Sequence, residues 1–106
     1  MSLRKRKING FDMILDPSDK GISRILLKNK GRELAFMSIL ERSVEYGMTC
    51  IDLGANIGYT TLPMLNRVGD TGHVWAIEPD PRSLKLLKKN IALNFEEGCS
   101  IFDCAI

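Results

Sequence analysis

Two acidic residues and two glycines have the types and spacing that suit a nucleotide-like cofactor. Asp52 lies in an apolar run, and Gly54 and Gly58 follow it. Glu78 ends a second apolar run, Val74–Ile77, and comes 20 positions after Gly58. At this spacing a second strand can bring a carboxylate to a ribose. A glycine turn that opens a helix offers unpaired N–H groups and partial positive charge. We therefore expect both groups to converge on one adenosine-bearing ligand.

The elements that must position these residues alternate between strand and helix. Apolar runs predict core strands at 48–53, 73–78 and 100–106, and helical periodicity predicts helices at 32–46, about 57–68 and 81–94. Pro63 indicates that the middle helix starts late, near Thr60, or bends. Asp80 is expected to cap the last helix, with Pro81 in its first position.

This alternation predicts parallel pairing with right-handed crossovers. The predicted fold class is α/β: a Rossmann-like three-layer sandwich whose partial doubly wound parallel sheet has the core strand order 3-2-1, with a short N-terminal strand pair and helix. Residues 8–15 predict a short strand, and 22–27 a second strand or a helical turn. We expect an N-terminal segment at 1–31 and the N-terminal half of a cofactor-binding domain at 32–106. The basic run Arg4–Lys7 could contact phosphate, lipid headgroups or RNA, but a solvated, frayed terminus is favoured.

The composition is that of an ordinary soluble domain. The 106 residues are 44% hydrophobic and 26% charged, and the net charge of +2 is too small to argue for nucleic acid. No apolar stretch approaches the ~20 residues of a membrane span, and no secretory signal is evident. Three cysteines and one histidine lack metal-ligand spacing, so we expect no metal and reduced thiols in the cytoplasm.

Two cofactors compete for the turn. A dinucleotide normally needs a glycine where this chain has Asn56, because the backbone must approach two phosphates closely. The asparagine side chain does not obviously crowd the smaller amino-acid end of S-adenosylmethionine. The residues therefore favour S-adenosylmethionine over NAD.

The segments 51–60, 72–81 and 87–94 resemble the FkbM-type family of S-adenosylmethionine-dependent methyltransferases. The likeness covers roughly residues 20–106, and its most specific parts are the D-x-G-A-N-x-G form that starts at Asp52 and the E-P-D-P form that starts at Glu78. It implies a floor under the methionine part of the cofactor, built from Gly54, Ala55, Asn56 and Gly58.

The same resemblance implies the remaining contacts. Asp52 would orient the cofactor ammonium, and Glu78 would accept from both ribose hydroxyls. Thr60 and Tyr59 would lie close by, with Tyr59 able to face the sulfonium. The adenine would be lined by Pro79 and Asp80 on one edge and by Asp103 and Ala105 on the other side.

The predicted function is S-adenosylmethionine-dependent methyl transfer to oxygen of a small molecule or sugar, with no nucleic-acid or membrane partner. The strands that would carry the substrate-gripping groups are not in the chain, so no catalytic residue is assigned. The outer edge of the first core strand is expected to be covered by the N-terminal segment or by a second copy in a homodimer. An NAD-dependent oxidoreductase fragment and a non-catalytic cofactor-binding or scaffold module are the alternatives.

Overall fold

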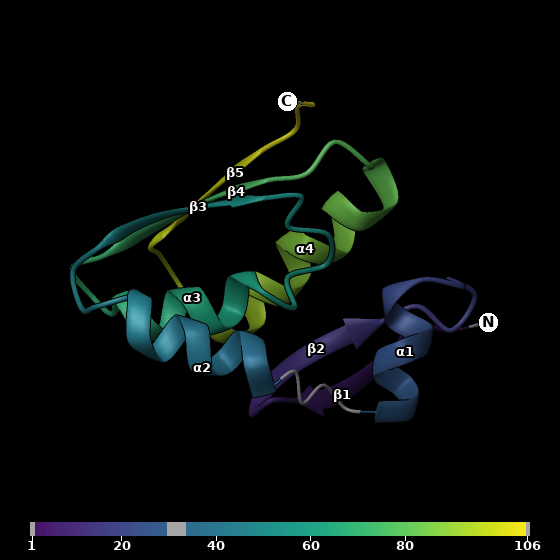
Figure 1. Ribbon diagram of the computed structural model, residues 1–106. Helices are drawn as coiled ribbons and strands as arrows, with labels where there is room; N and C mark the ends of the chain where they lie inside the picture. Colours follow the sequence, from purple (N-terminus) through teal and green to yellow (C-terminus); the bar gives the residue numbers. More distant parts are fainter. Residues whose placement is uncertain (1, 30–33, 106) are drawn as a thin grey trace.

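The computed structural model describes residues 2–29 and 34–105 (Figure 1). Its elements, in chain order, are β1 (Arg4–Ile8), β2 (Phe11–Leu15), α1 (Ile22–Asn29), α2 (Leu34–Ser43), β3 (Thr49–Leu53), α3 (Thr61–Val68), β4 (His73–Ile77), α4 (Pro81–Asn94) and β5 (Cys99–Phe102).

Strands β3, β4 and β5 form a parallel sheet in the order β3-β4-β5, which confirms the predicted strand order. Helices α2, α3 and α4 lie along one face of this sheet (Figure 1). Val74 and Ala76 of the central strand point into that face and have no exposed surface. The Rossmann-like α/β class is confirmed, although the described residues supply helices to one face of the sheet only.

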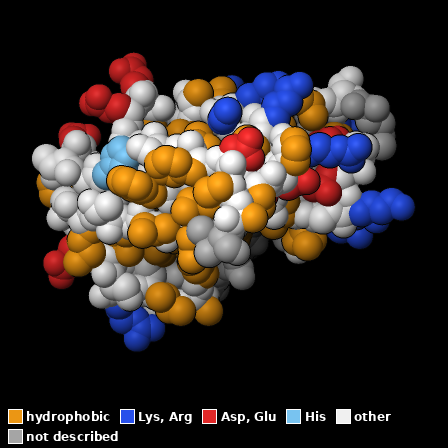
Figure 2. Space-filling view, turned by 90° about the horizontal axis from the view of Figure 1, so that it is seen from above, with side chains coloured by type: hydrophobic (Ala, Val, Ile, Leu, Met, Phe, Trp, Pro, Cys, Tyr) orange, Lys and Arg blue, Asp and Glu red, His pale blue; other side chains and the backbone are white. Residues whose placement is uncertain are grey.

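The opposite face of the sheet is apolar and exposed. Ile51 and Leu53 from β3, Trp75 from β4 and Phe102 from β5 all show more than a third of their surface. The rings of Trp75 and Phe102 stack with centroids 5.2 Å apart. Figure 2, seen from above, shows hydrophobic side chains gathered across this face.

Helices α3 and α4 begin where the sequence predicts. Helix α3 starts at Thr61, so Pro63 falls within its first turn, where the missing N–H costs little. Asp80 caps α4 by accepting a 2.9 Å hydrogen bond from the Ser83 N–H. The hydrogen bonds from Ser83 hold the pKa of the Asp80 carboxyl below its usual range.

The predicted short N-terminal strand pair and helix are confirmed, although the residues that form them differ from those predicted. Strands β1 and β2 form an antiparallel hairpin, with Arg4 opposite Leu15 and Ile8 opposite Phe11. Asn9 and Gly10 form its two-residue turn with φ of 51° and 87°, the conformation that an Asn-Gly hairpin requires. The basic run Arg4–Lys7 is therefore an ordered strand, and the segment from residue 22 is a helix.

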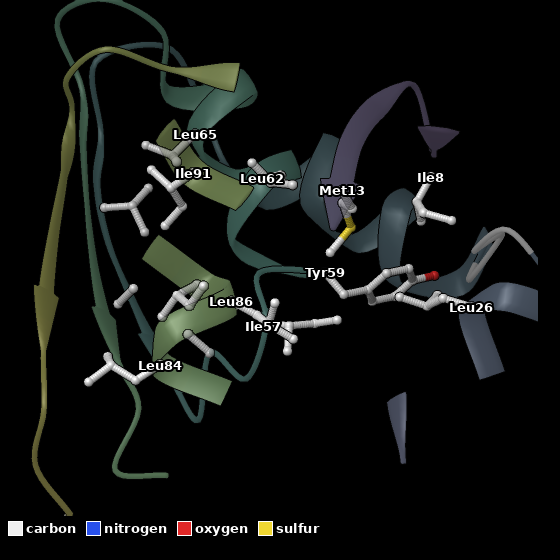
Figure 3. Close-up of a cluster of buried hydrophobic side chains, with 14 of the residues drawn as sticks. Ile8, Met13, Leu26, Ile57, Tyr59, Leu62, Leu65, Leu84, Leu86 and Ile91 are labelled. Atoms are coloured by element: carbon white, nitrogen blue, oxygen red, sulfur yellow. The ribbon is translucent and has the colours of Figure 1, made fainter. Parts of the chain in front are cut away.

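The N-terminal hairpin, residues 4–15, forms its own sheet and packs against α4. In the described residues β3 pairs with β4 alone, so the N-terminal segment does not cover the β3 edge by strand pairing, and cover by a second copy stays a prediction. Met13 of β2 and Leu26 of α1 are almost fully buried, beside Tyr59 (Figure 3). The predicted boundary between 31 and 32 lies outside the described residues.

Candidate cofactor site

The segment that joins β3 to α3, residues 54–60, is called the glycine loop here. Gly54, Asn56 and Gly58 have φ of 74°, 55° and 105°. Glycine adopts such angles without strain, and asparagine tolerates the left-handed region better than most residues. A side chain placed on Gly54 would meet no atom within 4 Å, so open space lies above the loop at this point.

Four backbone N–H groups of the glycine loop already have partners. Gly54 and Ala55 both donate to the Ile77 carbonyl, at 2.9 and 3.0 Å, and Gly58 donates to the Ala55 carbonyl. The fourth, on Asn56, donates to Glu78. This differs from our expectation of an open row of unpaired amides. The loop is thus poorly suited to holding a pyrophosphate, which needs several free donors.

Glu78 joins the glycine loop to the end of β4. Its Oε1 accepts from the Asn56 N–H at 2.8 Å and its Oε2 from the Asp80 N–H at 2.9 Å. The residue is only 7% exposed. A carboxylate has about four acceptor positions, so these two bonds orient the group and leave it able to accept from a ligand. The two parts of the sequence that predicted one site therefore meet in space.

Asp52 is the second buried carboxylate, at 6% exposure. Its Oδ2 accepts from the hydroxyls of Thr60 and Thr61, at 2.8 and 2.7 Å. Both hydroxyls donate to the same oxygen, so Oδ1 is the atom left to a ligand. Thr61 is fully buried and was missed by the sequence analysis, although a hydroxyl at a helix start beside a strand-end carboxylate was a usable signal.

Asp52 also affects the nearby thiol of Cys99. Burial, with the Asp52 charge as a second cause, raises the pKa of Cys99 to about 11. This cysteine is therefore a neutral thiol at physiological pH. All three cysteines are free.

The other predicted residues divide into buried and exposed positions. Tyr59 is 8% exposed, and its ring points toward Leu26 in the core (Figure 3), so its predicted contact with a sulfonium stays a prediction. Pro79 and Asp80 are exposed between β4 and α4. Asp103 and Ala105 are exposed just beyond β5, whose Phe102 carbonyl accepts from the Glu78 N–H at 3.0 Å.

Two cavities lie near the ends of the sheet. One of about 250 Å³ lies between Ile57 of the glycine loop, the start of α4 at Asp80, and the β2–α1 turn at Asp16. A larger one of about 750 Å³ is lined by His73 and Gly98 at the amino ends of β4 and β5. The larger cavity contains no predicted site residue and lies at the wrong end of the strands for a cofactor in this type of sheet.

Neither a metal cluster nor a membrane span is found in the part of the chain that the structure describes. No group of three His, Cys, Asp or Glu side chains among residues 2–29 and 34–105 is placed to hold a metal ion. Every helix in the same ranges is too short or too polar to cross a lipid bilayer.

Comparison with known proteins places these features in a family. Residues 6–102 match the TRM5/TYW2 methyltransferase domain. A curated relative from Sulfolobus acidocaldarius, a probable cobalt-precorrin-6B C(15)-methyltransferase (decarboxylating), is 25% identical over 71% of this chain and 39% of its own length.

Solved structures agree with this match. TYW2 of P. horikoshii in complex with MeSAdo has a TM-score of 0.74 and 25% identity, over 97% of this chain and 36% of that protein. TYW2 of M. jannaschii in complex with AdoMet has a TM-score of 0.71 and 22% identity, over 94% of this chain and 42% of that protein, and supports the fold. The chain thus spans about two fifths of the length of these relatives.

The comparisons confirm a class I methyltransferase domain and correct two finer predictions. The family is TRM5/TYW2 rather than the FkbM-type family. TRM5/TYW2 enzymes act on tRNA, so the prediction of a small-molecule acceptor and no nucleic-acid partner was wrong. The small-molecule acceptor had been inferred from the FkbM-type resemblance, and the net charge of +2 gave no argument for a nucleic-acid partner.

Proposed function

Because this chain belongs to the TRM5/TYW2 methyltransferase domain family, we propose that it forms the cofactor-binding part of an S-adenosylmethionine-dependent enzyme that modifies tRNA. The observation that carries the proposal is the hydrogen bond that Glu78 accepts from the Asn56 N–H, which joins the two halves of the predicted site, together with the bond that Glu78 accepts from the Asp80 N–H.

The residues of the site suit this cofactor chemically. Asp52 and Glu78 are buried carboxylates that keep acceptor capacity, and a buried charge needs partners to offset its lost hydration. In the proposed arrangement Asp52 orients the cationic ammonium and Glu78 accepts from the ribose hydroxyls. Gly54 leaves the space that the methionine part needs. Bound there, the cofactor supplies an electrophilic methyl group on a sulfonium.

The rest of the predicted contacts complete the proposal. Ala55, Asn56 and Gly58 belong to the floor, and Thr60 holds Asp52 in place through its hydroxyl. Pro79 and Asp80 would lie along one adenine edge, with Asp103 and Ala105 opposite. No residue of this chain is proposed as a general base.

A tRNA partner is supported by the N-terminal hairpin as well as by the family. Arg4, Lys5, Arg6 and Lys7 of β1 are all exposed, and they form a short basic strand. Lys7 also pairs with Asp12 at 2.9 Å, which leaves the other three for a phosphate backbone. Exposed arginine and lysine side chains supply the salt-sensitive part of RNA binding through their contacts with phosphate.

Calorimetric titration with S-adenosylhomocysteine and with NAD⁺ tests the cofactor. We expect binding of the first and none of the second, because four backbone N–H groups of the glycine loop are already engaged within the protein. Transfer of a radiolabelled methyl group to unmodified tRNA, with a small-sugar mixture as the comparison acceptor, tests the substrate. Binding of NAD⁺ with no S-adenosylhomocysteine binding would reject the proposal.

A further inference from the structure

We propose that Asn90 of α4 is a positioning residue that couples the N-terminal hairpin to the glycine loop. Asn90 has no exposed surface, and its side-chain amide contacts both regions. The Nδ2 group donates to the Ile57 carbonyl at 2.8 Å and to the Ile14 carbonyl at 3.3 Å, while Oδ1 accepts from the Ile14 N–H. The inference rests on the proposed function only in taking the glycine loop as part of a cofactor site.

The bond to Ile57 fixes a peptide plane inside the glycine loop. The Ile57 carbonyl and the Gly58 N–H belong to the same rigid peptide unit. The Asn90 amide holds the carbonyl side of this unit, and the Ala55 carbonyl accepts from its N–H side at 3.0 Å. This unit joins Ile57 to Gly58, and Gly58 and the preceding Asn56 both have positive φ. Orientation of the unit therefore sets the local shape of the loop.

The bond to Ile14 attaches the same amide to β2. In an antiparallel pair, alternate residues direct their N–H and C=O groups away from the partner strand. Asp12 and Ile14 are two such residues, and each pairs both groups with one asparagine amide of α4: Asp12 with Asn94, and Ile14 with Asn90.

The spacing of the two asparagines matches the strand. Two residues of a strand rise about 6.7 Å, and four residues of a helix rise about 6 Å. Asn90 and Asn94 therefore take the place of a neighbouring strand along the free edge of β2. A displacement of the hairpin is transmitted to Asn90 and, through it, to the Ile57 carbonyl.

Asn94 supplies a matched control because it makes the hairpin contact without the loop contact. Its Oδ1 accepts from the Asp12 N–H at 3.1 Å, and its Nδ2 donates to the Asp12 carbonyl at 2.8 Å. Its remaining bond goes to the Asn90 carbonyl within α4. Loss of either asparagine weakens the attachment of β2, but only Asn90 touches the glycine loop.

The experiment compares Asn90→Ser with Asn94→Ser in the full chain. Serine cannot span the distance to the partner carbonyls, and it leaves room for water. We expect both variants to lower Tm by similar amounts. Only Asn90→Ser should weaken S-adenosylhomocysteine binding, by roughly tenfold, as expected for one lost buried hydrogen bond. Asn94→Ser should stay within about threefold of the wild type.

Hydrogen exchange separates this inference from the proposed function. The Gly58 amide should exchange faster in Asn90→Ser than in Asn94→Ser, whether or not any cofactor binds. If the wild type binds no S-adenosylhomocysteine while this difference is present, the proposed function fails and the coupling stands. Equal Gly58 exchange in the two variants, or equal losses of affinity, would overturn the coupling.

A measurement on the wild type covers the case in which Asn90→Ser does not fold. The side-chain NH₂ protons of Asn90 and Asn94 have separate NMR signals. Because Asn90 alone touches the loop, S-adenosylhomocysteine should shift its signals and leave those of Asn94 in place. Shifts of equal size, or none at either residue, would contradict the role of Asn90.

Discussion

The glycine loop and the N-terminal hairpin are held by hydrogen bonds of very different sequence separation. At the loop, Asp52 pairs with hydroxyls 8 and 9 positions away, and Glu78 pairs with an amide 22 positions away. At the hairpin, Asn90 and Asn94 pair with residues 76 and 82 positions away.

This difference distinguishes the contacts that shape the candidate site from the contacts that hold the hairpin. The contacts of Asp52 and Glu78 form between β3, the glycine loop, α3 and the start of α4, and Asn90 of α4 adds the one described contact that also reaches the hairpin. Contacts that hold the hairpin need α4 in helical form, because Asn90 and Asn94 act as a pair only on one face of a helix. Changes in the hairpin region that leave Asn90 in place should therefore lower the free energy of unfolding, and changes at the carboxyl ends of β3 and β4 should weaken ligand binding.

The strongest test of this separation is Leu26→Ala. Leu26 is 2% exposed in α1 and lies against the core side chains beside Tyr59 (Figure 3). Removing its methyl groups leaves a cavity, and we expect a loss of about 2–5 kcal/mol in the free energy of unfolding. Urea denaturation measures this loss. S-adenosylhomocysteine affinity, measured well below Tm, should stay within threefold of the wild type, and a parallel loss of affinity would break the comparison.

Glu78→Gln tests the other region of this comparison, the glycine loop. The substituted amide has the same size but offers an NH₂ group to a backbone N–H, so two donors face each other at either Asn56 or Asp80. We expect S-adenosylhomocysteine to bind about 100-fold more weakly, since charge-assisted hydrogen bonds to the ribose are lost. The Tm of Glu78→Gln should fall much less than the Tm of Leu26→Ala. Unchanged binding by calorimetry would mean that Glu78 serves only to close the loop.

The same contrast explains what could be predicted from the sequence. Glu78 and the glycine loop were predicted to meet because parallel strands end at one edge of a sheet, and the Asp80 cap and late start of α3 follow from local chemistry at Pro63 and Pro81. Asn90 carried no such signal, since an asparagine in a helix has no evident partner until β2 is placed beside it.

A short N-terminal strand pair was predicted, but its strands were expected at 8–15 and 22–27 rather than at 4–8 and 11–15. Asn9-Gly10 is a strong turn signal, but the four basic residues before it indicated a solvated terminus. The strand forms because Ile8 lies opposite Phe11 and is buried, while Arg4 and Lys5 keep their charges in solvent. A count of net charge cannot detect this arrangement.

The basic strand gives a third, smaller expected effect. Replacing Arg4 and Lys5 with glutamate should weaken tRNA binding about tenfold near 100 mM salt, and should make the slope of log K against log salt less negative by about 1.5. Fluorescence anisotropy with labelled tRNA measures both. The control replaces Lys85 and Lys88, exposed on α4, with glutamate and changes the net charge equally. An equal loss in the control would show that net charge, rather than this strand, attracts the RNA.

The smallest expected effect concerns the end of β5, where Asp103 and Ala105 are proposed to flank the adenine. Cys104 lies between them and is exposed, so an aromatic disulfide reagent should modify it first. Cys99 serves as an internal reference. With a pKa of about 11, roughly one thousandth of this thiol is ionised at pH 8, and its reaction should accelerate only as the pH rises toward that value.

If the adenine covers residues 103–105, saturating S-adenosylhomocysteine should slow the reaction of Cys104 severalfold and leave that of Cys99 unchanged. An unchanged Cys104 rate, with binding verified by calorimetry in the same buffer, would move the adenine away from residues 103–105 and leave Glu78 as the contact that defines the site.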